Sequence, residues 1–498
     1  MNPAGRTIAK NAGFLMASQV VTWGLALVAT IFLPRYLGAA GLGRFQLAIS
    51  VWAIMSIVIG FGMDTLLAKE ISRDPNRVSE LLATSVLLRT GIFLASFALT
   101  VVYAQAAGYP QETRAIIYII GLSTLIWQVS LACGASLQGL ERMEFISLSS
   151  IAAKGFSTTL TIIFLLKGYS LLLIAFVEVG SALISLVVQY FALNRIQKLQ
   201  LSFDRHLLVW MLKTSFPYLI LSGFLVAYGQ IDIIIISLLV SEKQIGWYSV
   251  ATRLTGTFVF IPTVFMAALL PASSRMHKNA PEDLRRLMSK SFDLLLLVCI
   301  PIGFGVMILS SQLVLNLYGS DFVTSGPILA VMGVVVIFFS LNMFVAQFFI
   351  SSDRQNVWIV AMAVSTVMTI PLDLVLVPWC QKTFGIGALG GSLSYLLTES
   401  GIVVFGLVML PKGMLSWKNG WLAVRMVIAG LAMAAVVWWV RGLFIAIPVG
   451  IGITVYLVLI LVLRVISQED WALFEAMSSS ITARLRGARP PKPVLSED

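Results

Sequence analysis

Three basic side chains, Arg89, Lys154 and Arg253, stand inside long apolar stretches, and they are the Lys and Arg residues assigned to the interior of the predicted spans. An ionisable group at the middle of a bilayer costs roughly 2.5–3.5 kcal/mol on insertion scales, so each is a candidate for function. A guanidinium offers a planar fork of donors to phosphate oxygens, and an ammonium adds a compact positive charge. The three residues therefore predict a site for an anionic ligand. The other interpretation of each is snorkelling or a structural ion pair.

Lys154 lies on a polar stripe, and a second stripe follows in the next apolar run. The two stripes, spaced at three and four residues, are Ser147, Ser150, Lys154, Ser157 and Thr161, and then Glu178, Ser181, Ser185 and Gln189. Such spacing places each set on one helix face, which must meet other helices or water rather than lipid. Small hydroxyls also join helices directly, so the stripes predict either a cavity wall or a helix contact.

Three carboxylates, Asp232, Glu178 and Glu399, fall inside apolar runs as well. They could balance the basic residues or take up H⁺ or Na⁺ to drive a transport cycle, because an apolar setting favours the neutral form of a carboxyl group. Asp373 comes near the end of its run and directly after Pro371 and Leu372, which predicts a place at the membrane interface. Asp232 and Arg253 are expected to pair when the cavity is empty.

Soluble chemistry finds little support in the chain. No Gly-Lys pair occurs, so no phosphate-binding loop of the Walker type exists, and no Gly-x-Ser-x-Gly motif is found. The three cysteines are scattered, and the two histidines stand in separate loops, which predicts neither a disulfide framework nor a metal centre. We expect no enzyme activity and no bound cofactor apart from a coupling H⁺ or Na⁺.

The composition requires a membrane. Of 498 residues, 58% are apolar and only 11% are charged, against about a quarter charged in a soluble chain. Apolar runs of about twenty residues, long enough for a helix to cross the hydrocarbon core, predict fourteen spans. The spans are 12–33, 43–63, 82–104, 114–137, 146–166, 170–192, 209–240, 246–272, 289–310, 327–350, 357–378, 387–410, 419–440 and 443–464.

The net charge of +11 is distributed unevenly between the two sets of loops. Three of the 34 Lys and Arg fall inside spans and 24 fall in the loops on the side of both termini. The other seven are Arg35, Arg44, Arg114, Lys167, Lys243, Lys382 and Arg441. Lys and Arg favour the cytoplasmic side, so both termini are predicted to be cytoplasmic in a multi-pass protein of the cell membrane. No nucleic-acid partner is expected.

Two short matches predict an internal repeat. Residues 41–48, entering the second span, resemble 244–251, entering the eighth, at a shift of 203; residues 138–143 resemble 350–355 at a shift of 212. Six spans separate the copies, so both halves have the same orientation. We predict a bundle of six helices over 1–200, a second over 201–412, an added helical hairpin over 413–466 and a cytoplasmic tail over 467–498. Under the first shift Arg253 corresponds to Ser50, an asymmetry that favours contact with cargo.

Several stretches resemble a known family. They are Leu33-Pro34-Arg35-Tyr36-Leu37-Gly38, Gly41-Leu42-Gly43-Arg44-Phe45, Gly60-Phe61-Gly62, Lys69-Glu70-Ile71-Ser72-Arg73, Gln138-Gly139-Leu140-Glu141-Arg142, Gln230-Ile231-Asp232 and Ile245-Gly246-Trp247-Tyr248. With them the chain resembles the Wzx-type oligosaccharide flippases, in the polysaccharide-exporter branch of the multidrug/oligosaccharidyl-lipid/polysaccharide superfamily. It is less similar to the peptidoglycan-precursor flippases.

The resemblance implies an all-α, MATE-like pair of six-helix bundles that works by alternating access. The implied cargo is an oligosaccharide on a polyprenyl pyrophosphate, moved to the outer leaflet for cell-surface polysaccharide synthesis beside other assembly proteins. Arg89, Lys154 and Arg253 would then bind the pyrophosphate. A cation-coupled multidrug exporter of the same superfamily is one alternative. A membrane glycan polymerase or ligase is the other, although the predicted outer loops are short for an enzyme.

Overall fold

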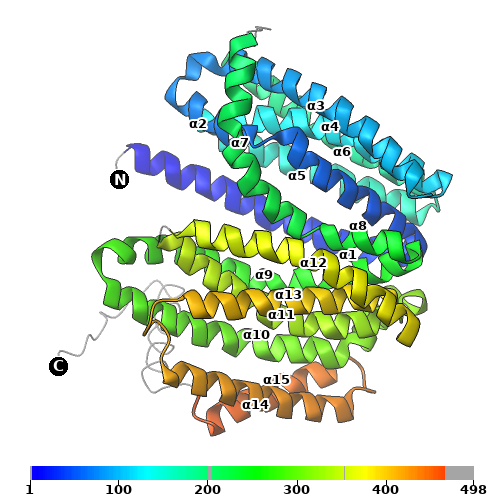
Figure 1. Cartoon of the computed structure of the whole chain (residues 1–498), viewed down its shortest axis with the longest axis vertical. Coiled ribbons are helices and arrows are strands. Elements are labelled where there is room, and N and C mark those ends of the chain that lie inside the picture. The colour runs from blue at the N-terminus through cyan, green and yellow to red at the C-terminus, as the bar shows by residue number, and fades with distance from the viewer. Residues whose placement is uncertain (1–2, 200–204, 353, 466–498) are drawn as a thin grey trace, which may run out of the picture.

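Long α-helices, and no strands, make up the computed structural model over the residues it describes, which are 3–199, 205–352 and 354–465 (Figure 1). Helices satisfy every backbone group internally, which an apolar bilayer demands. The all-α prediction is confirmed. The predicted tail over 467–498 lies outside the described residues.

The described chain forms fifteen α-helices joined by short loops. The first half contains α1 (Pro3–Gly60), α2 (Met63–Arg73), α3 (Val78–Ala106), α4 (Gln111–Gly139), α5 (Met143–Leu166) and α6 (Leu171–Ile196). The second half contains α7 (Arg205–Tyr228), α8 (Ile231–Leu239), α9 (Glu242–Asn279), α10 (Pro281–Tyr318), α11 (Ser325–Ser351), α12 (Gln355–Phe384) and α13 (Gly387–Met409). The hairpin is α14 (Trp417–Val440) and α15 (Ala446–Val462).

The number of membrane passes agrees with the sequence. Eleven of the described helices are long and apolar enough to cross a membrane. The first of them, α1, turns at Gly38, whose φ of 67° lies in the left-handed region that favours glycine, and so makes two passes. The broken pair α7–α8 and the shorter α15 supply two more, which brings the total to fourteen.

Two predicted spans differ from the helices observed. The second pass ends at Gly60, and α2 begins anew at Met63 after Phe61 and Gly62, both at positive φ. The seventh predicted span is interrupted at Gly229 between α7 and α8. The first break coincides with the predicted end of the second span at residue 63, whereas the second break was not predicted, because the apolar run continues through Gly229.

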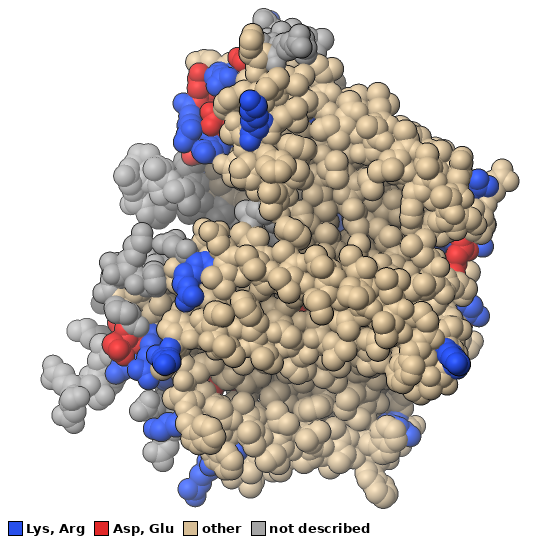
Figure 2. Space-filling view, viewed as in Figure 1, with Lys and Arg blue, Asp and Glu red and all other residues tan. Residues whose placement is uncertain are grey.

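The helices gather into two groups that meet at one end and diverge towards the other (Figure 1). The first group holds α2 to α6, the second holds α9 to α13, and the hairpin α14–α15 packs against α10. Helix α1 contacts α4 and α5 of the first group and α9 of the second. Lys and Arg gather at the two ends of the molecule, with a broad uncharged belt between them (Figure 2). This is the surface that a bilayer requires.

The internal repeat is visible in how equivalent helices end. At the end of α4 the amide of Arg142 donates to the carbonyl of Leu137, 2.9 Å away. At the end of α11 the amide of Arg354 donates to the carbonyl of Phe349, 2.8 Å away, and both residues are shifted by the predicted 212 positions. The two halves therefore repeat backbone detail as well as sequence.

Candidate substrate cavity

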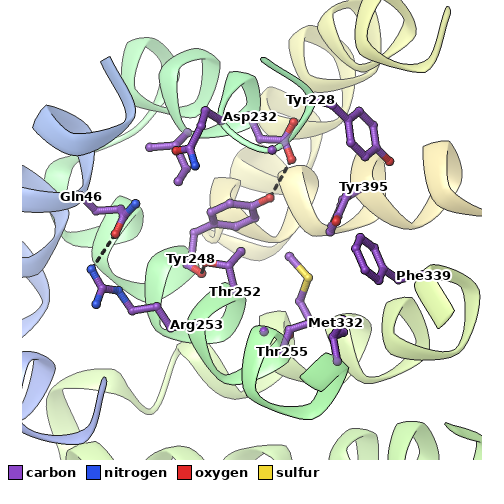
Figure 3. Close-up of a pocket in the computed structure, with 15 residues that line it drawn as sticks. Gln46, Tyr228, Asp232, Tyr248, Thr252, Arg253, Thr255, Met332, Phe339 and Tyr395 are labelled. Atoms are coloured by element: carbon purple, nitrogen blue, oxygen red, sulfur yellow. Dashed lines mark hydrogen bonds between the residues drawn. The ribbon is translucent and has the colours of Figure 1, made fainter. Parts of the chain in front are cut away.

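A cavity of about 260 Å³ lies between the two helix groups, lined by α1, α7, α8, α9, α11 and α13. Arg253 and Asp232 both line it, together with Tyr228, Tyr248 and Tyr395 (Figure 3). The structure thus brings together two of the charged residues that the sequence predicted, from α9 and α8. Aromatic and apolar walls with a few placed polar groups are typical of a ligand-binding site.

Arg253 is held by a chain of polar side chains rather than by a carboxylate. Its Nη2 donates to Oε1 of Gln46 at 2.8 Å, while its Nε has no hydrogen-bond partner among the described residues. Gln46 in turn approaches Ser50 at 3.5 Å, and Ser50 donates to Gln230 at 2.8 Å. A guanidinium with donors to spare, next to a cavity, is ready to bind an anion.

Asp232 accepts a hydrogen bond of 2.9 Å from the hydroxyl of Tyr248, and its Oδ1 is unbonded within the described residues. The described residues show no ion pair between Asp232 and Arg253, although both line one cavity (Figure 3). The prediction that the two pair when the cavity is empty is wrong for this conformation. Arg253 is bonded to Gln46 instead of Asp232, and Asp232 is bonded to Tyr248 instead of Arg253.

Two further carboxylates lie near Asp232 in the second helix group. Glu399 accepts a hydrogen bond of 2.6 Å from Tyr228 and is bonded by the amide of Asn342. Asp373, on α12, is fully buried, and neither carboxylate oxygen has a hydrogen-bond partner of good geometry in the described chain. The predicted interface position of Asp373 is therefore wrong: its side chain points into the bundle, towards Ser394 and Asp232.

A second, larger cavity of about 580 Å³ lies in the first helix group, between α1, α4, α5 and α6. Lys154 and Glu178 both line it, in agreement with one of the two interpretations of the polar stripes. Glu178 accepts a hydrogen bond of 2.8 Å from Ser157, and no described residue forms an ion pair or hydrogen bond with Lys154. The stripes are thus walls of a cavity over part of their length.

Arg89 lines neither cavity. Its side chain is fully buried, and every guanidinium nitrogen is used: Nε donates to Ser85, Nη1 to the backbone and side chain of Gln128, and Nη2 to Asp64 at 2.6 Å. Asp64 belongs to α2, so this cluster fixes α2 against α3 and α4 at the break that follows Gly60. We therefore leave Arg89 out of the anion site and assign it a structural role.

Replacing Arg89 with alanine should lower the free energy of unfolding by about 3 kcal/mol. This is the lower end for removing one partner of a buried pair, because Asp64 is half exposed and regains water. Thermal unfolding of the purified protein measures the loss, and Arg77→Ala, a half-exposed arginine on the same side, should change it by no more than about 0.5 kcal/mol. Normal stability with lost transport would instead place Arg89 in the cargo site.

At one end of the molecule the two halves are joined by charged side chains. Arg44, of α1, is bonded to Glu112 of α4 and, at 2.6 Å through its Nε, to Glu242 of α9. Glu242 is also bonded by the hydroxyl of Thr113. Glu242 thus ties α9 to two helices of the first half.

Asp321 joins the halves at the same end. Its carboxylate accepts a hydrogen bond of 2.7 Å from the amide of Ala39 and lies 3.1 Å from the ammonium of Lys243. The Ala39 amide, helped by Lys243, holds the pKa of the Asp321 carboxyl below its usual range. A depressed pKa means that this contact is fully present at neutral pH and is lost only as the pH falls through the lowered value.

Close backbone packing accompanies these bonds. A Cβ atom built on Gly43 would lie 1.9 Å from the carbonyl oxygen of Glu242, and one built on Gly246 would lie 1.8 Å from that of Ala39. The shift of 203 residues relates Gly43 to Gly246 and Ala39 to Glu242, so the two contacts are equivalents under the internal repeat. We call this set of contacts around Gly43 and Gly246 the outer contact, after the side of the membrane on which the distribution of Lys and Arg predicts it to lie.

Some residues of the site were not singled out from the sequence. Gln46 and Gln230 stood within matched motifs, but nothing in one sequence showed that they would hold Arg253 in a chain of hydrogen bonds. Tyr228, Tyr248 and Tyr395 looked like ordinary residues of apolar helices. Their clustering around the carboxylates depends on tertiary packing.

This architecture defines a class: a helical membrane transporter with one polar cavity between two repeated bundles and another within the first bundle. The chain belongs to the polysaccharide biosynthesis protein family, whose model matches residues 8–277. A second family model, MatE, matches residues 217–375. These matches confirm the superfamily predicted from the motifs.

Named relatives and solved structures point the same way. The chain is 20% identical over 403 residues to the "Probable low-salt glycan biosynthesis flippase Agl15" of Haloferax volcanii, covering 78% of this chain and 81% of that one. It is 23% identical to the "Succinoglycan biosynthesis transport protein ExoT" of Rhizobium meliloti, over 66% of each chain.

Among structures, the lipid II flippase MurJ in an inward closed conformation matches with a TM-score of 0.72 and 15% identity, over 91% of this chain and 98% of that one. An inward-facing MATE family multidrug transporter matches with a TM-score of 0.64 and 14% identity, over 77% of this chain and 93% of that one. At these identities the likeness establishes the shared fold, which confirms the predicted MATE-like architecture.

Proposed function

We propose that this protein flips a polyprenyl-pyrophosphate-linked oligosaccharide from the cytoplasmic to the outer leaflet by alternating access. It supplies cell-surface polysaccharide synthesis as a transporter, with no bond made or broken in its cargo. The observation that carries the proposal is Arg253, a guanidinium at a cavity between the two halves to which no carboxylate of the described residues is bonded. The family and its named glycan flippase support the choice of cargo.

A pyrophosphate can accept hydrogen bonds from the guanidinium of Arg253 and neutralise its positive charge. Two anionic phosphate groups present oxygens at the spacing of a guanidinium fork, and a site away from bulk water strengthens each bond. A cationic drug, the cargo of the rival multidrug exporter, would be repelled by the same group. Asp232 lines the same cavity and would attract a cation, so the preference for an anionic cargo is a property of Arg253 rather than of the whole cavity.

Reconstitution tests the proposal directly. Vesicles are prepared with a polyprenyl-pyrophosphate oligosaccharide in both leaflets, with or without the purified protein, so that transport exchanges the glycan between the leaflets. An impermeant glycosidase added outside should then digest nearly all of the glycan, compared with about half in protein-free vesicles. Digestion that stops at half in both would show that the protein does not flip this lipid.

We propose further that both termini are cytoplasmic in the cell membrane, so that the outer contact faces outside. The uneven distribution of Lys and Arg supports this orientation. The diverging end of the bundles then opens to the cytoplasm, where lipid-linked sugars are made. The outer contact would close the path to the outside in this conformation.

Single cysteines should report that orientation. A cysteine in place of Ser320, in the exposed turn before α11, should react with an impermeant thiol reagent added to intact cells. One in place of Asn76, in the exposed turn before α3, should react only after the membrane is opened. The native cysteines at 133, 299 and 380 are buried, so their background should be low. The reverse pattern would invert the proposed topology.

We propose that the acids of the second bundle couple transport to an ion gradient of H⁺ or Na⁺. Asp232 and Asp373 act on one another electrostatically, and between them three carboxylate oxygens lack hydrogen-bond partners in the described residues. Two anions so placed repel each other unless a proton or a cation joins them. Glu399, already bonded by Tyr228 and Asn342, would hold the surrounding helices rather than the ion.

Asp232→Asn should keep cargo binding and lose the dependence of transport on the gradient. The neutral amide removes the repulsion that an ion would relieve, so the rate with a gradient should fall at least ten-fold, to the rate without one. Imposing H⁺ and Na⁺ gradients separately on the vesicles identifies the ion. Asp283→Asn, an exposed acid in the first turn of α10, is the matched control. Unchanged gradient dependence would make Asp232 a structural group.

A further inference from the structure

The larger cavity of the first bundle is not needed to explain how a pyrophosphate is held. It lies between α1, α4, α5 and α6 and has a volume of about 580 Å³, against about 260 Å³ for the cavity at Arg253. Its charged groups are one cation, Lys154, and one anion, Glu178. The cavity at Arg253 also holds one cation and one anion, so its larger volume and the exposed indole described next, rather than its charge, distinguish the cavity of the first bundle.

An exposed indole forms one side of this cavity. Trp127, on α4, is 40% exposed and lines the cavity with Trp52. The two indoles differ in their surroundings: Trp52 is 1% exposed, stacks with Phe93 and Phe97, and donates its Nε1 to a backbone carbonyl. Trp127 is therefore the indole with a face available to a ligand.

Hydrogen-bonding groups surround Trp127. The hydroxyl-bearing residues that line the cavity are Thr22, Ser56, Ser123, Thr124, Ser150, Ser157 and Ser181. One carboxylate oxygen of Glu178 accepts from Ser157, and the ammonium of Lys154 has no assigned partner among the described residues. Six of these seven hydroxyls already donate within the protein, to a backbone carbonyl or to the Glu178 carboxylate, so they offer acceptor oxygens to a ligand. With the Glu178 carboxylate as a further acceptor and the Lys154 ammonium as a donor, the cavity can both accept from and donate to the hydroxyl groups of a ligand.

A pyranose has the complementary surface. Its C–H groups form an apolar face that stacks on an indole, and its rim carries hydroxyls that pair with carboxylates, ammonium groups and side-chain hydroxyls. Aromatic walls with a few polar groups that set orientation are general features of small-molecule sites. A sugar satisfies both parts of this cavity at once.

The two cavities are adjacent along α1. Gln46, which bonds Arg253, lines the smaller one, and Ile49 and Ala53 line the larger one. At 1.5 Å per residue these positions are roughly 5 to 10 Å apart along the helix axis. Glu178 is also close enough to Arg253 for their charges to interact. One ligand can therefore reach both cavities.

We propose that the cavity at Trp127 is a subsite for the sugar residues nearest the pyrophosphate, with the indole as stacking platform and Glu178 and Lys154 as hydroxyl partners. The inference rests on the proposed function. It assigns the sugar end and the pyrophosphate end of the cargo head group to different bundles. Sugars occupy the first bundle, while the pyrophosphate stays at Arg253 in the second.

Photo-cross-linking in cells that make their own glycan tests this division. A photoreactive amino acid replaces Ser150 in the larger cavity or Val259 in the smaller one. Captured lipid-linked glycan is then treated with mild acid, which splits the bond between sugar and phosphate. The adduct at 150 should keep its sugar and release the lipid, whereas the adduct at 259 should keep the lipid and release its sugar.

The outcomes separate the two proposals. An adduct at 150 that keeps lipid, or none at 150 with a glycan-lipid adduct at 259, overturns the sugar subsite and leaves the proposed function standing. Adducts without glycan at both positions overturn the proposed function, and the subsite with it.

A variant series tests the stacking platform. Trp127→Ala should lower cross-linking at 150 at least ten-fold relative to cross-linking at 259, and Trp127→Phe should restore it to within about two-fold. Trp439→Ala, an indole 87% exposed on the hairpin, is the matched control and should change nothing. An unchanged ratio between the two positions in Trp127→Ala, or a loss that phenylalanine does not repair, overturns the role of Trp127.

Discussion

Replacing Arg253 with alanine should reduce glycan export by roughly 30-fold to several thousand-fold, with the protein still inserted and abundant. Removing one partner of a buried, hydrogen-bonded charge contact costs about 2–5 kcal/mol, and each 1.4 kcal/mol is a factor of ten. The fold should survive, because Arg253 makes one hydrogen bond to a neutral side chain and carries an unbonded Nε in the described structure.

Arg253→Lys separates charge from geometry. Lysine keeps the positive charge but loses the planar fork, so export should recover only in part. Vesicle flipping rates measure both variants, and Arg441→Ala, an exposed arginine stacked on Trp438 after α14, is the matched control. The control should transport at the normal rate.

The variant Gln46→Ala tests whether the loss of transport in Arg253→Ala has a purely structural cause. If Arg253 only holds Gln46, and through it the contact between α1 and α9, then Gln46→Ala should be as damaging as Arg253→Ala. We expect Gln46→Ala to retain most transport, since a pyrophosphate replaces the lost acceptor. Full activity of Arg253→Ala would remove this residue from the cargo site altogether.

The sequence predicted much of this molecule because a bilayer restricts where polar groups can lie. Twenty-residue apolar runs left helices as the default, and the repeat motifs led to two bundles. Helical spacing placed Lys154 and Glu178 on helix faces that must avoid lipid, and it left a cavity wall and a helix contact as the two interpretations. These inferences depend on patterns among residues close together in the sequence, and such patterns can be read from a single chain.

What could not be predicted depends on distant partners. From the sequence, Arg89 was predicted to bind an anion. In the structure its guanidinium is bonded to Asp64, 25 positions earlier. Asp64 lies on α2, a helix that follows the second apolar run and was not predicted as a separate element. Asp373 looked like an interface residue, and only the packing of α12 on α8 and α13 turns it inward. Burial and partner choice for a charged residue are tertiary properties, so its role stays open until the helices are placed.

Alanine in place of Gly246 should force the two halves apart at the outer contact and shift the protein towards an outward-open state. The new Cβ would lie 1.8 Å from the carbonyl oxygen of Ala39, and the helix backbones must separate to accept it. Gly43→Ala should act in the same way, because its Cβ would meet the carbonyl of Glu242 at 1.9 Å. Small residues let helix backbones approach closely in membranes, which is the property lost here.

The size of the shift follows from the cost of overpacking. An extra methyl group in a tight contact costs about 1–3 kcal/mol, which changes the ratio of outer-closed to outer-open molecules roughly 5- to 150-fold. A cysteine in place of Thr252, on the wall of the cavity at Arg253, should then react faster with an impermeant thiol reagent from outside. Export should fall at least ten-fold, since a transporter that cannot close outside cannot complete its cycle.

Two further variants, a control on α3 and the double variant of Gly43 and Gly246, test the prediction for the outer contact. Gly91→Ala on α3, where a Cβ meets nothing within 4 Å, should leave both labelling and export unchanged. The double variant of Gly43 and Gly246 should be hardly worse than either single one, because one separation of the halves relieves both clashes. If Gly246→Ala labels and exports like the unmodified protein, the close packing at this end is not a gate, and closure must depend on Arg44, Glu242 and Asp321 alone.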